Sequence, residues 1–169
     1  MKLYKNAIIL IVVLAILVGA YVFVKNVKKD DSGSDSGSEI IKIFDLDTNK
    51  MVELTLENKD GKFVFVKETV KEKNEDGEEV EKKVWKITSP ADLKIDSSSV
   101  NSIAINFSSL TADKVIEENA TDLSIYGLND PVRVSVKMDD GTVKTIEVGN
   151  KTPTDSGYYA KEKDSSKVY

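Results

Sequence analysis

Pairs of aspartates are the residues whose spacing could support catalysis in this chain. Asp139 and Asp140 are adjacent, and Asp122 and Asp130 lie close together in the sequence. Two carboxyl groups that face one cleft can hydrolyse a glycosidic bond without histidine. All four aspartates fall in predicted turns, where capping and turn formation explain them equally well. The sequence therefore leaves a carboxylate-based envelope hydrolase as an alternative function and assigns no catalytic residue.

Other catalytic and metal chemistries are limited by composition, because the chain has no histidine and no cysteine. Ser-His-Asp, Cys-His and HExxH mechanisms are excluded, and so are thiolate metal sites. Acidic turns at 74–77, 139–141 and 164–166 suggest calcium, but no stretch fits the EF-hand pattern. Segment 30–39 also spaces its acids, and its Gly/Ser content favours a tether. We expect no cofactor and no metal site.

Charge is distributed unevenly along the chain. Residues 30–169 contain 19 of the 24 basic residues and all 29 acidic residues, a formal net charge of −10. A domain with this balance repels phosphate backbones, and no basic face interleaved with aromatic residues is evident. We therefore expect no nucleic-acid partner and only weak contact with anionic lipid headgroups.

The segment Ala7–Val24 predicts a membrane anchor. It contains 18 consecutive uncharged residues, close to the lower limit of about 17 to 25 needed to span the hydrocarbon core. Lysines flank it on both sides and can reach the headgroups. A cleaved signal peptide is the rival, but Gly19 and Ala20 are followed by bulky residues rather than a small-x-small site. A buried soluble helix fits the polar flanks less well, so the lipid bilayer is the first expected partner.

The predicted orientation places the N-terminus in the cytoplasm and the C-terminal domain outside it. Lysines on the two sides of the apolar run nearly balance, but a tail of only six residues precedes the run, as in a signal anchor. Residues 25–39 follow as a basic juxtamembrane segment and a Gly/Ser/Asp-rich linker without apolar residues from Asp30 to Glu39. We expect a single-pass protein with residues 1–6 as a short tail and 40–169 as its folded domain.

Short alternating runs after residue 40 predict β-strands. Segments 40–46 and 51–56 are expected to pair through a turn at 45–50. Turn signals at 58–61 and 74–77 flank segment 63–73, which together with 78–87 predicts a long hairpin. Its outer half is so rich in charge that its tip should project into water, either as a contact for a partner or as a solvated extension.

One amphipathic helix is predicted from Asp96 or Ser97 to about Leu110, with a single apolar stripe that packs on the sheet. Segment 112–118 is ambiguous, and its β-branched residues favour a strand. Segment 122–128 predicts one helical turn closed by Gly127, which Pro131 prevents from continuing. The apolar stripe of the predicted helix that ends near Leu110 is formed by Val100, Ile103, Ala104, Phe107 and Leu110.

Two more hairpins complete the predicted domain. Segments 132–138 and 142–148 flank the Asp139–Gly141 turn, and 158–163 with 167–169 form a third hairpin that the chain end interrupts. The fold class is therefore α+β: a transmembrane helix followed by a mostly antiparallel β domain with one packed helix. We expect a domain of this kind to bind a partner rather than catalyse a reaction.

An ordered series of short motifs resembles the DUF4340 family, a bacterial domain of unknown function often placed behind an N-terminal transmembrane helix. The resemblance covers roughly residues 40–169 and implies an α+β domain outside the membrane, in some members associated with ABC-transporter or gliding-motility-like systems. It carries over no catalytic residues. Family members usually continue beyond the last strand, which implies a truncated or naturally short chain. The motifs are Trp85–Pro90, Asp96 with Val100 and Ile103, Tyr126–Leu128, Asp130–Pro131, Asp140–Gly141, Ile146–Gly149, Gly157–Tyr159 and Lys167–Tyr169.

Structural roles explain most of these motif residues. Gly127, Gly141 and Gly149 suit turns, and Pro131 fixes an extended conformation. Trp85 and Tyr126 are expected to fill the core, while Tyr158, Tyr159 or Trp85 could stack on a glycan or peptide. The leading functional hypothesis is a membrane-tethered extracytoplasmic accessory or binding module with a protein partner in a transporter or envelope complex.

Overall fold

The computed structural model describes residues 40–169 with the exception of 75–76 and 92. The predicted anchor and linker lie outside the described residues. Within the part of the chain that is described, no helix combines the length and apolar composition required to cross a bilayer.

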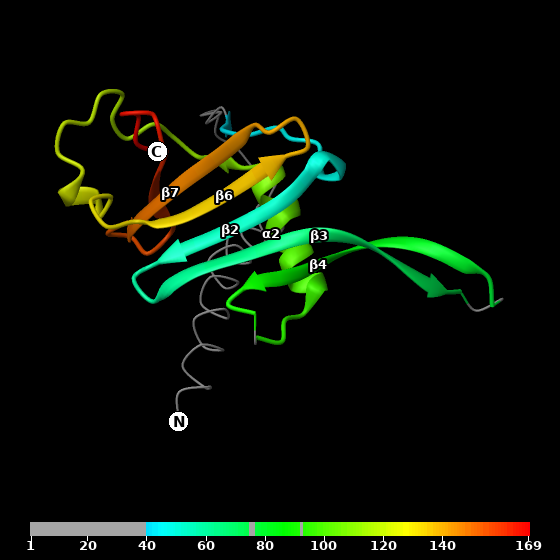
Figure 1. The fold of residues 1–169 in the computed structure, drawn as a ribbon. Coiled ribbons are helices and arrows are strands. Elements are labelled where there is room, and N and C mark those ends of the chain that lie inside the picture. The colour runs from blue at the N-terminus through cyan, green and yellow to red at the C-terminus, as the bar shows by residue number, and fades with distance from the viewer. Residues whose placement is uncertain (1–39, 75–76, 92) are drawn as a thin grey trace. The chain divides into compact units, whose positions relative to one another are not determined.

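A six-stranded antiparallel sheet forms the centre of the domain, with strand order β4-β3-β2-β6-β7-β8 (Figure 1). A separate two-stranded ladder joins β1 to β5. This arrangement confirms the predicted α+β class of mostly antiparallel strands with a helix. The strands are β1 Ile41–Lys42, β2 Met51–Asn58, β3 Gly61–Lys73, β4 Glu79–Ser89, β5 Thr111–Ala112, β6 Val132–Met138, β7 Val143–Lys151 and β8 Tyr158–Glu162; the helices are η2 Thr48–Lys50, α2 Ser97–Ser108 and η3 Ser124–Tyr126.

The core lies on the side of the sheet that faces α2. Side chains alternate between the two faces of a strand, so the register of β2, β3, β6 and β7 directs one apolar set toward the helix. Phe65, Leu54 and Val136 are fully buried in this layer. The remaining core residues are Phe44, Met51, Leu56, Trp85, Val100, Ile103, Ala104, Phe107, Leu128, Val134, Met138, Ile146 and Val168.

Helix α2 forms where the sequence predicts it. The Asp96 carboxylate accepts hydrogen bonds from the backbone N–H groups of Ser98 and Ser99, each at 3.1 Å, and this cap starts the helix. The predicted stripe is buried except for Leu110, which lies beyond the helix end and is partly exposed. On the sheet side, the Trp85 backbone N–H donates to Ser97 Oγ at 2.8 Å, so β4 and the first turn of α2 hold each other in place.

The first strand pairing predicted from the sequence is wrong. Segment 40–46 does not pair with β2; Ile41 and Lys42 pair with Ala112 and Thr111. The reason is packing on the helix: the Phe44 ring stacks on Phe107, with centroids 4.9 Å apart, and the predicted turn folds as the short helix η2. The apolar residues of segment 40–46 therefore cover α2 rather than extend the sheet.

Segment 112–118 is also not the strand that its β-branched residues favour. Only Thr111–Ala112 forms a strand, and Glu117 makes a single antiparallel bridge to Val168. Val168 is fully buried, so this contact with the distant end of the chain determines the path of the segment. Local propensity does not encode such a long-range contact.

The remaining hairpins agree with the sequence, with one change. Hairpins β3–β4 and β6–β7 and the helical turn at 124–126 are present. In the third predicted hairpin, segment 167–169 does not form a full strand. It pairs with β8 only where Ala160 and Tyr169 exchange two backbone hydrogen bonds of 3.1 and 2.8 Å. Val168 also exchanges backbone hydrogen bonds with Glu117, so segment 167–169 is paired on both sides rather than left with an open edge.

Candidate functional site

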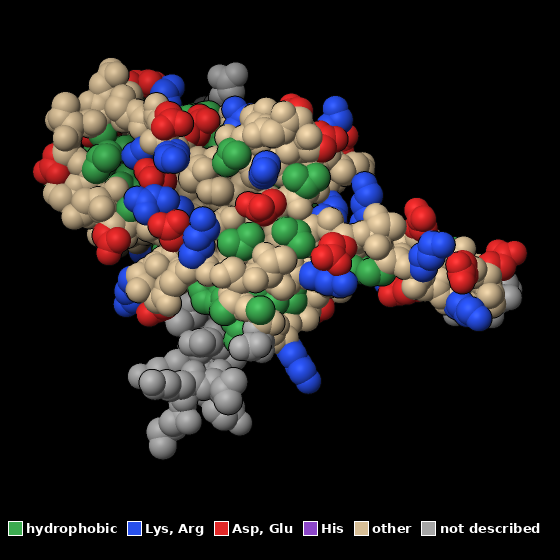
Figure 2. Space-filling model, in the orientation of Figure 1, with side chains coloured by type: hydrophobic (Ala, Val, Ile, Leu, Met, Phe, Trp, Pro, Cys, Tyr) green, Lys and Arg blue, Asp and Glu red, His purple; other side chains and the backbone are tan. Residues whose placement is uncertain are grey.

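The face of the sheet opposite α2, here called the open face, is not covered by any other helix or sheet among residues 40–169 outside the gaps at 75–76 and 92. Charged side chains of both signs alternate on it with small apolar groups (Figure 2). Hydroxyl side chains occupy its centre, where Ser135 and Thr145 are 2.8 Å apart. The strand register places these residues on the open face: Glu53, Thr55, Glu57, Lys62, Val64, Val66, Lys86, Arg133, Ser135, Lys137, Val143, Thr145, Glu147 and Lys161.

A row of alternating charges crosses four strands of this face. Glu57 on β2 faces Arg133 on β6, Arg133 faces Glu147 on β7, and Glu147 faces Lys161 on β8. The Arg133 guanidinium is 3.4 Å from Glu57 Oε1 and 2.9 Å from Glu147 Oε1, and Lys161 Nζ is 2.9 Å from Glu147 Oε2. We call these four residues the ion row. Every charge in it has an opposite charge as its neighbour on the next strand.

The ion row becomes more buried toward β8. Arg133 retains 37% of its side-chain exposure, whereas Glu147 and Lys161 are 7% and 4% exposed as whole residues. Burial by itself would raise the pKa of Glu147, but hydrogen bonds and charges from Lys161 and Arg133 outweigh it and leave that pKa below its ordinary value. The hydrogen bond that Arg133 donates to Glu147 is the largest cause that raises the pKa of Arg133.

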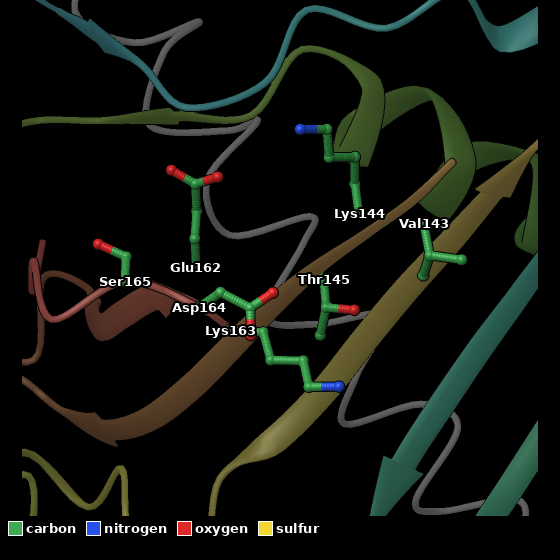
Figure 3. A pocket seen from close by; sticks show the side chains of 7 residues that line it. All are labelled: Val143, Lys144, Thr145, Glu162, Lys163, Asp164 and Ser165. Atoms are coloured by element: carbon green, nitrogen blue, oxygen red, sulfur yellow. The ribbon is translucent and has the colours of Figure 1, made fainter. Parts of the chain in front are cut away.

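A hollow of about 340 Å³ opens beside the buried end of the ion row. Its lining comes from two segments, the start of β7 and the turn that follows β8 (Figure 3). Lysines and carboxylates are present in equal number, together with two hydroxyl groups. The hollow therefore has no charge preference that would select an anion or a cation. The lining residues are Val143, Lys144, Thr145, Glu162, Lys163, Asp164 and Ser165.

The outer part of hairpin β3–β4 extends beyond the rest of the sheet (Figure 1). Pairing between β2 and β3 ends at Val66, so later residues of β3 have β4 as their sheet partner on one side only. We call residues 68–73 and 79–84 the finger. At its root, Lys67 Nζ donates to the Thr48 carbonyl at 2.8 Å and lies 4.9 Å from the centre of the Trp85 ring.

The two faces of the finger differ in chemistry. One continues the open face and combines three valines with Glu68, Glu72 and Lys82; we call it the valine face. The opposite face is entirely polar and contains Thr69, Lys71, Lys73, Glu79, Glu81 and Lys83. Val80 is 41% exposed, while Val70 and Val84 are partly exposed. Alternation in the sequence thus becomes a two-sided ribbon in the structure.

The four aspartates that the sequence singles out do not have the properties of a catalytic pair. All of them are exposed, and none lines the hollow. Hydrogen bonds from Ser124 lower the pKa of Asp122, and those from Thr142 lower the pKa of Asp140. A general acid requires the opposite shift. Asp122 and Asp140 instead act as turn residues that accept backbone hydrogen bonds.

The acidic turns likewise serve the backbone. In the described part of 74–77, the Asn74 side chain accepts from the Glu78 N–H at 2.8 Å. Within the described ranges, 40–74, 77–91 and 93–169, no three acidic side chains gather as a possible metal site. Segment 30–39 lies outside those ranges.

The aromatic and glycine motif residues divide between expected and unexpected roles. Trp85 is buried, as predicted, and so cannot stack on a ligand. Tyr126 is only half-buried; its hydroxyl donates to Glu117 at 2.8 Å and its ring meets Tyr159 edge-on. Gly149 is not in a turn: it lies within β7, where any β-carbon would collide with the Tyr126 carbonyl oxygen. Close backbone approach explains this glycine.

The ion row is the feature that sequence reasoning missed. Its members occupy the polar positions of alternating strands, a pattern that the sequence does contain. Their adjacency depends on the strand order, in which β2 lies between β3 and β6, and nothing local specifies that order. Knowledge of the order and register would have been enough to find the row.

Taken together, the fold and the site define a two-layer α+β domain with one exposed sheet face and a protruding hairpin. Residues 85–169, about half the chain, match the family described as Domain of unknown function (DUF4340). The chain belongs to this family, as its motifs indicate. Comparison with curated proteins and with solved structures gives no match.

Proposed function

We propose that this protein is a membrane-tethered binding module outside the cytoplasm, whose finger docks a protein partner in a transporter or envelope complex. The sequence supports the tether through the uncharged run Ala7–Val24 and the Gly/Ser/Asp-rich segment Asp30–Glu39. A flexible linker of this composition lets a domain search for a partner near the membrane. The folded domain then needs a surface that a partner can recognise.

The observation that carries the proposal is the valine face of the finger. The finger extends past the last β2 pairing, so the sheet does not need it for its own core. Even so, it carries Val70, Val80 and Val84 on a single face, with Val80 41% exposed. Burying apolar area releases about 25 cal/mol per Å², so a partner that covers this face gains affinity from side chains that the isolated fold leaves in water.

Charge on the finger favours a protein over a membrane or a nucleic acid. The finger together with the segment 74–78 that joins its two strands contains four lysines and seven acidic residues, a net charge of −3 that repels phosphate groups. On the valine face the charges already have partners: Lys82 Nζ is 3.3 Å from Glu72 and Lys86 Nζ is 2.7 Å from Glu68. The expected partner surface is therefore apolar at its centre with a polar rim.

Site-directed crosslinking can test the proposal, because the chain has no cysteine that would compete. Val80→Cys carries a photoreactive maleimide on the valine face, and Glu81→Cys carries it on the opposite face of the same strand. In membranes of the native host, we expect a discrete adduct from Val80→Cys and not from Glu81→Cys. The adduct should disappear when Val70→Glu is added. Equal adducts from both positions, or no adduct from either, would contradict docking through this face.

The location of the domain is tested with the same variant. A maleimide that cannot cross membranes should label Val80→Cys on cells whose cytoplasmic membrane is intact. Labelling that requires lysis of that membrane would reverse the proposed orientation, whatever the crosslinking result.

A further inference from the structure

The Lys161 ammonium is enclosed by oxygen atoms. Nζ is 2.9 Å from Glu147 Oε2, and it donates to three backbone carbonyls, those of Glu162 at 3.0 Å, Lys163 at 2.9 Å and Ser165 at 3.1 Å. The residue is 4% exposed. Three backbone carbonyl oxygens from the turn and one carboxylate oxygen thus replace the water that normally surrounds a lysine ammonium.

This oxygen set has the chemistry of a cation site. Backbone carbonyls and carboxylates are the ligands that hard cations take, and carbonyl groups can replace the hydration shell of a monovalent ion. An ammonium offers three N–H donors, fewer than the four oxygens around it. The arrangement is therefore organised around a positive charge at its centre as much as around individual hydrogen bonds.

The charges nearby require a cation at this position. Glu147 uses Oε1 for Arg133 and Oε2 for Lys161, and Arg133 is shared with Glu57. Without the ammonium, two carboxylates would share one guanidinium, and the more buried of them would lose a partner. An unpaired buried charge is strongly destabilising.

The turn around Lys161 also fixes neighbouring parts of the domain. Ser166 accepts a backbone hydrogen bond from Ala120 at 2.9 Å, and Val168 follows between Glu117 and β8. Glu162, Lys163 and Ser165 also line the hollow shown in Figure 3. The position of the ammonium thus determines the path of the chain from β8 to Tyr169.

We propose that the turn Glu162–Ser165 is a monovalent-cation site that the chain fills with its own Lys161 ammonium. The tethered cation holds the turn closed, and with it one wall of the hollow and the docking of segment 166–169. Removal of the side chain should leave a cage that accepts a small free cation such as ammonium or potassium.

Cation rescue tests this proposal on the full-length protein. Lys161→Ala should lower Tm by roughly 10 °C, because it breaks a buried ion pair. Ammonium or potassium chloride should restore part of that loss in a saturable manner, whereas tetramethylammonium chloride at equal ionic strength should not. Lys161→Met, whose side chain fills the space, should respond equally to all three salts. A Lys161→Ala protein with native Tm, or one that all three salts stabilise equally, would overturn the proposal.

A measurement on the unaltered protein covers the case in which Lys161→Ala does not fold. An amine-reactive acetylating reagent should modify exposed Lys163 at least ~100-fold faster than Lys161, because Lys161 reacts only when the turn opens. Mass spectrometry of the two positions gives the ratio. Similar rates at Lys161 and Lys163 would show that the cage does not hold the ammonium.

Discussion

Lysine–glutamate pairs occur at both ends of the six-stranded sheet, but in different surroundings. At the β8 end, Glu147 and Lys161 are 9% and 6% exposed in their side chains. In the finger, Glu72 and Lys82 are 52% and 61% exposed. Both pairs bridge adjacent antiparallel strands. Glu147 and Lys161 are direct cross-strand partners, whereas Glu72 lies opposite Val80, Lys82 lies opposite Val70, and the two side chains meet diagonally. The largest difference between the two pairs is the access of water.

This difference indicates what each region does for the protein. Exposed ion pairs contribute about 0 to 1 kcal/mol, whereas breaking a buried pair costs about 3 to 5 kcal/mol. Charges at the β8 end therefore hold the fold together. Charges on the finger keep a protruding ribbon soluble, and they discourage pairing of its open edges with other chains. A region that contributes little to stability is free to serve recognition.

The largest effect should come from Gly149 at the stable end of the sheet. Gly149→Ala places a β-carbon against the Tyr126 carbonyl oxygen, and the backbone must shift, at a cost of about 4 kcal/mol. Urea unfolding of the purified protein measures this loss. Gly157→Ala is the matched control, since nothing lies within 4 Å of its built β-carbon; it should change stability by less than about 1 kcal/mol. Equal effects of the two substitutions would refute the close approach.

The next largest effect comes from a direct comparison of the buried Glu147–Lys161 pair with the exposed Glu72–Lys82 pair. Glu147→Gln keeps the shape of the side chain but removes the charge between Arg133 and Lys161, and it should cost about 3 kcal/mol. Glu72→Gln makes the same change in the finger and should cost less than about 0.5 kcal/mol. Denaturant unfolding of both variants provides the comparison. A larger loss of unfolding free energy from Glu72→Gln than from Glu147→Gln would mean that the finger, rather than the β8 end, holds the fold together.

Acid should reduce the difference in unfolding free energy between the unaltered protein and the Glu147→Gln variant. The pKa of Glu147 is lowered in the folded state, so its contribution is complete above the unfolded pKa, about 4.3. That contribution is lost as pH falls through the still lower folded pKa. The gap in unfolding free energy between the two proteins should therefore be constant from pH 7 to about 5 and shrink below about 4. A gap that widens in acid would mean that the fold raises the pKa of Glu147 rather than lowering it.

Shortening the finger should also have only a small effect on stability. Replacement of Lys71–Glu81 by Asn-Gly closes the hairpin with a two-residue turn next to Val70 and Lys82, which are cross-strand partners. The unfolding free energy should change by less than about 1 kcal/mol, because few buried groups are lost. Crosslinking through Val84→Cys should nevertheless fall sharply in the shortened protein. A large loss of stability would show that the finger supports the fold rather than a partner.

Local features of the sequence were sufficient to predict several elements. The Asp96 cap and the apolar stripe after it specify α2, and the turn residues around 58–61 and 139–141 specify two hairpins. These predictions hold because caps, turns and short alternating runs depend on residues that are neighbours in the chain. The DUF4340 motifs add the family, and the match over residues 85–169 confirms it.

Predictions that depended on distant partners were less successful. Segment 40–46 has the alternation of a strand, but its Phe44 packs on Phe107 of α2. Segment 112–118 has β-branched residues, yet only Glu117 bridges, and its partner is Val168. In both cases a contact across more than fifty residues determines the path, and a short window of sequence does not contain it.

By itself, the sequence determined the helix, the hairpins, the charge-rich tip of the finger and the absence of histidine and cysteine chemistry. The tertiary structure alone decided which strands are neighbours. Strand order brings Glu57, Arg133, Glu147 and Lys161 into one row and aligns the valines of the finger with the open face. The physical reason is that alternation assigns each residue to a face, while adjacency on that face depends on pairing between segments far apart in the chain.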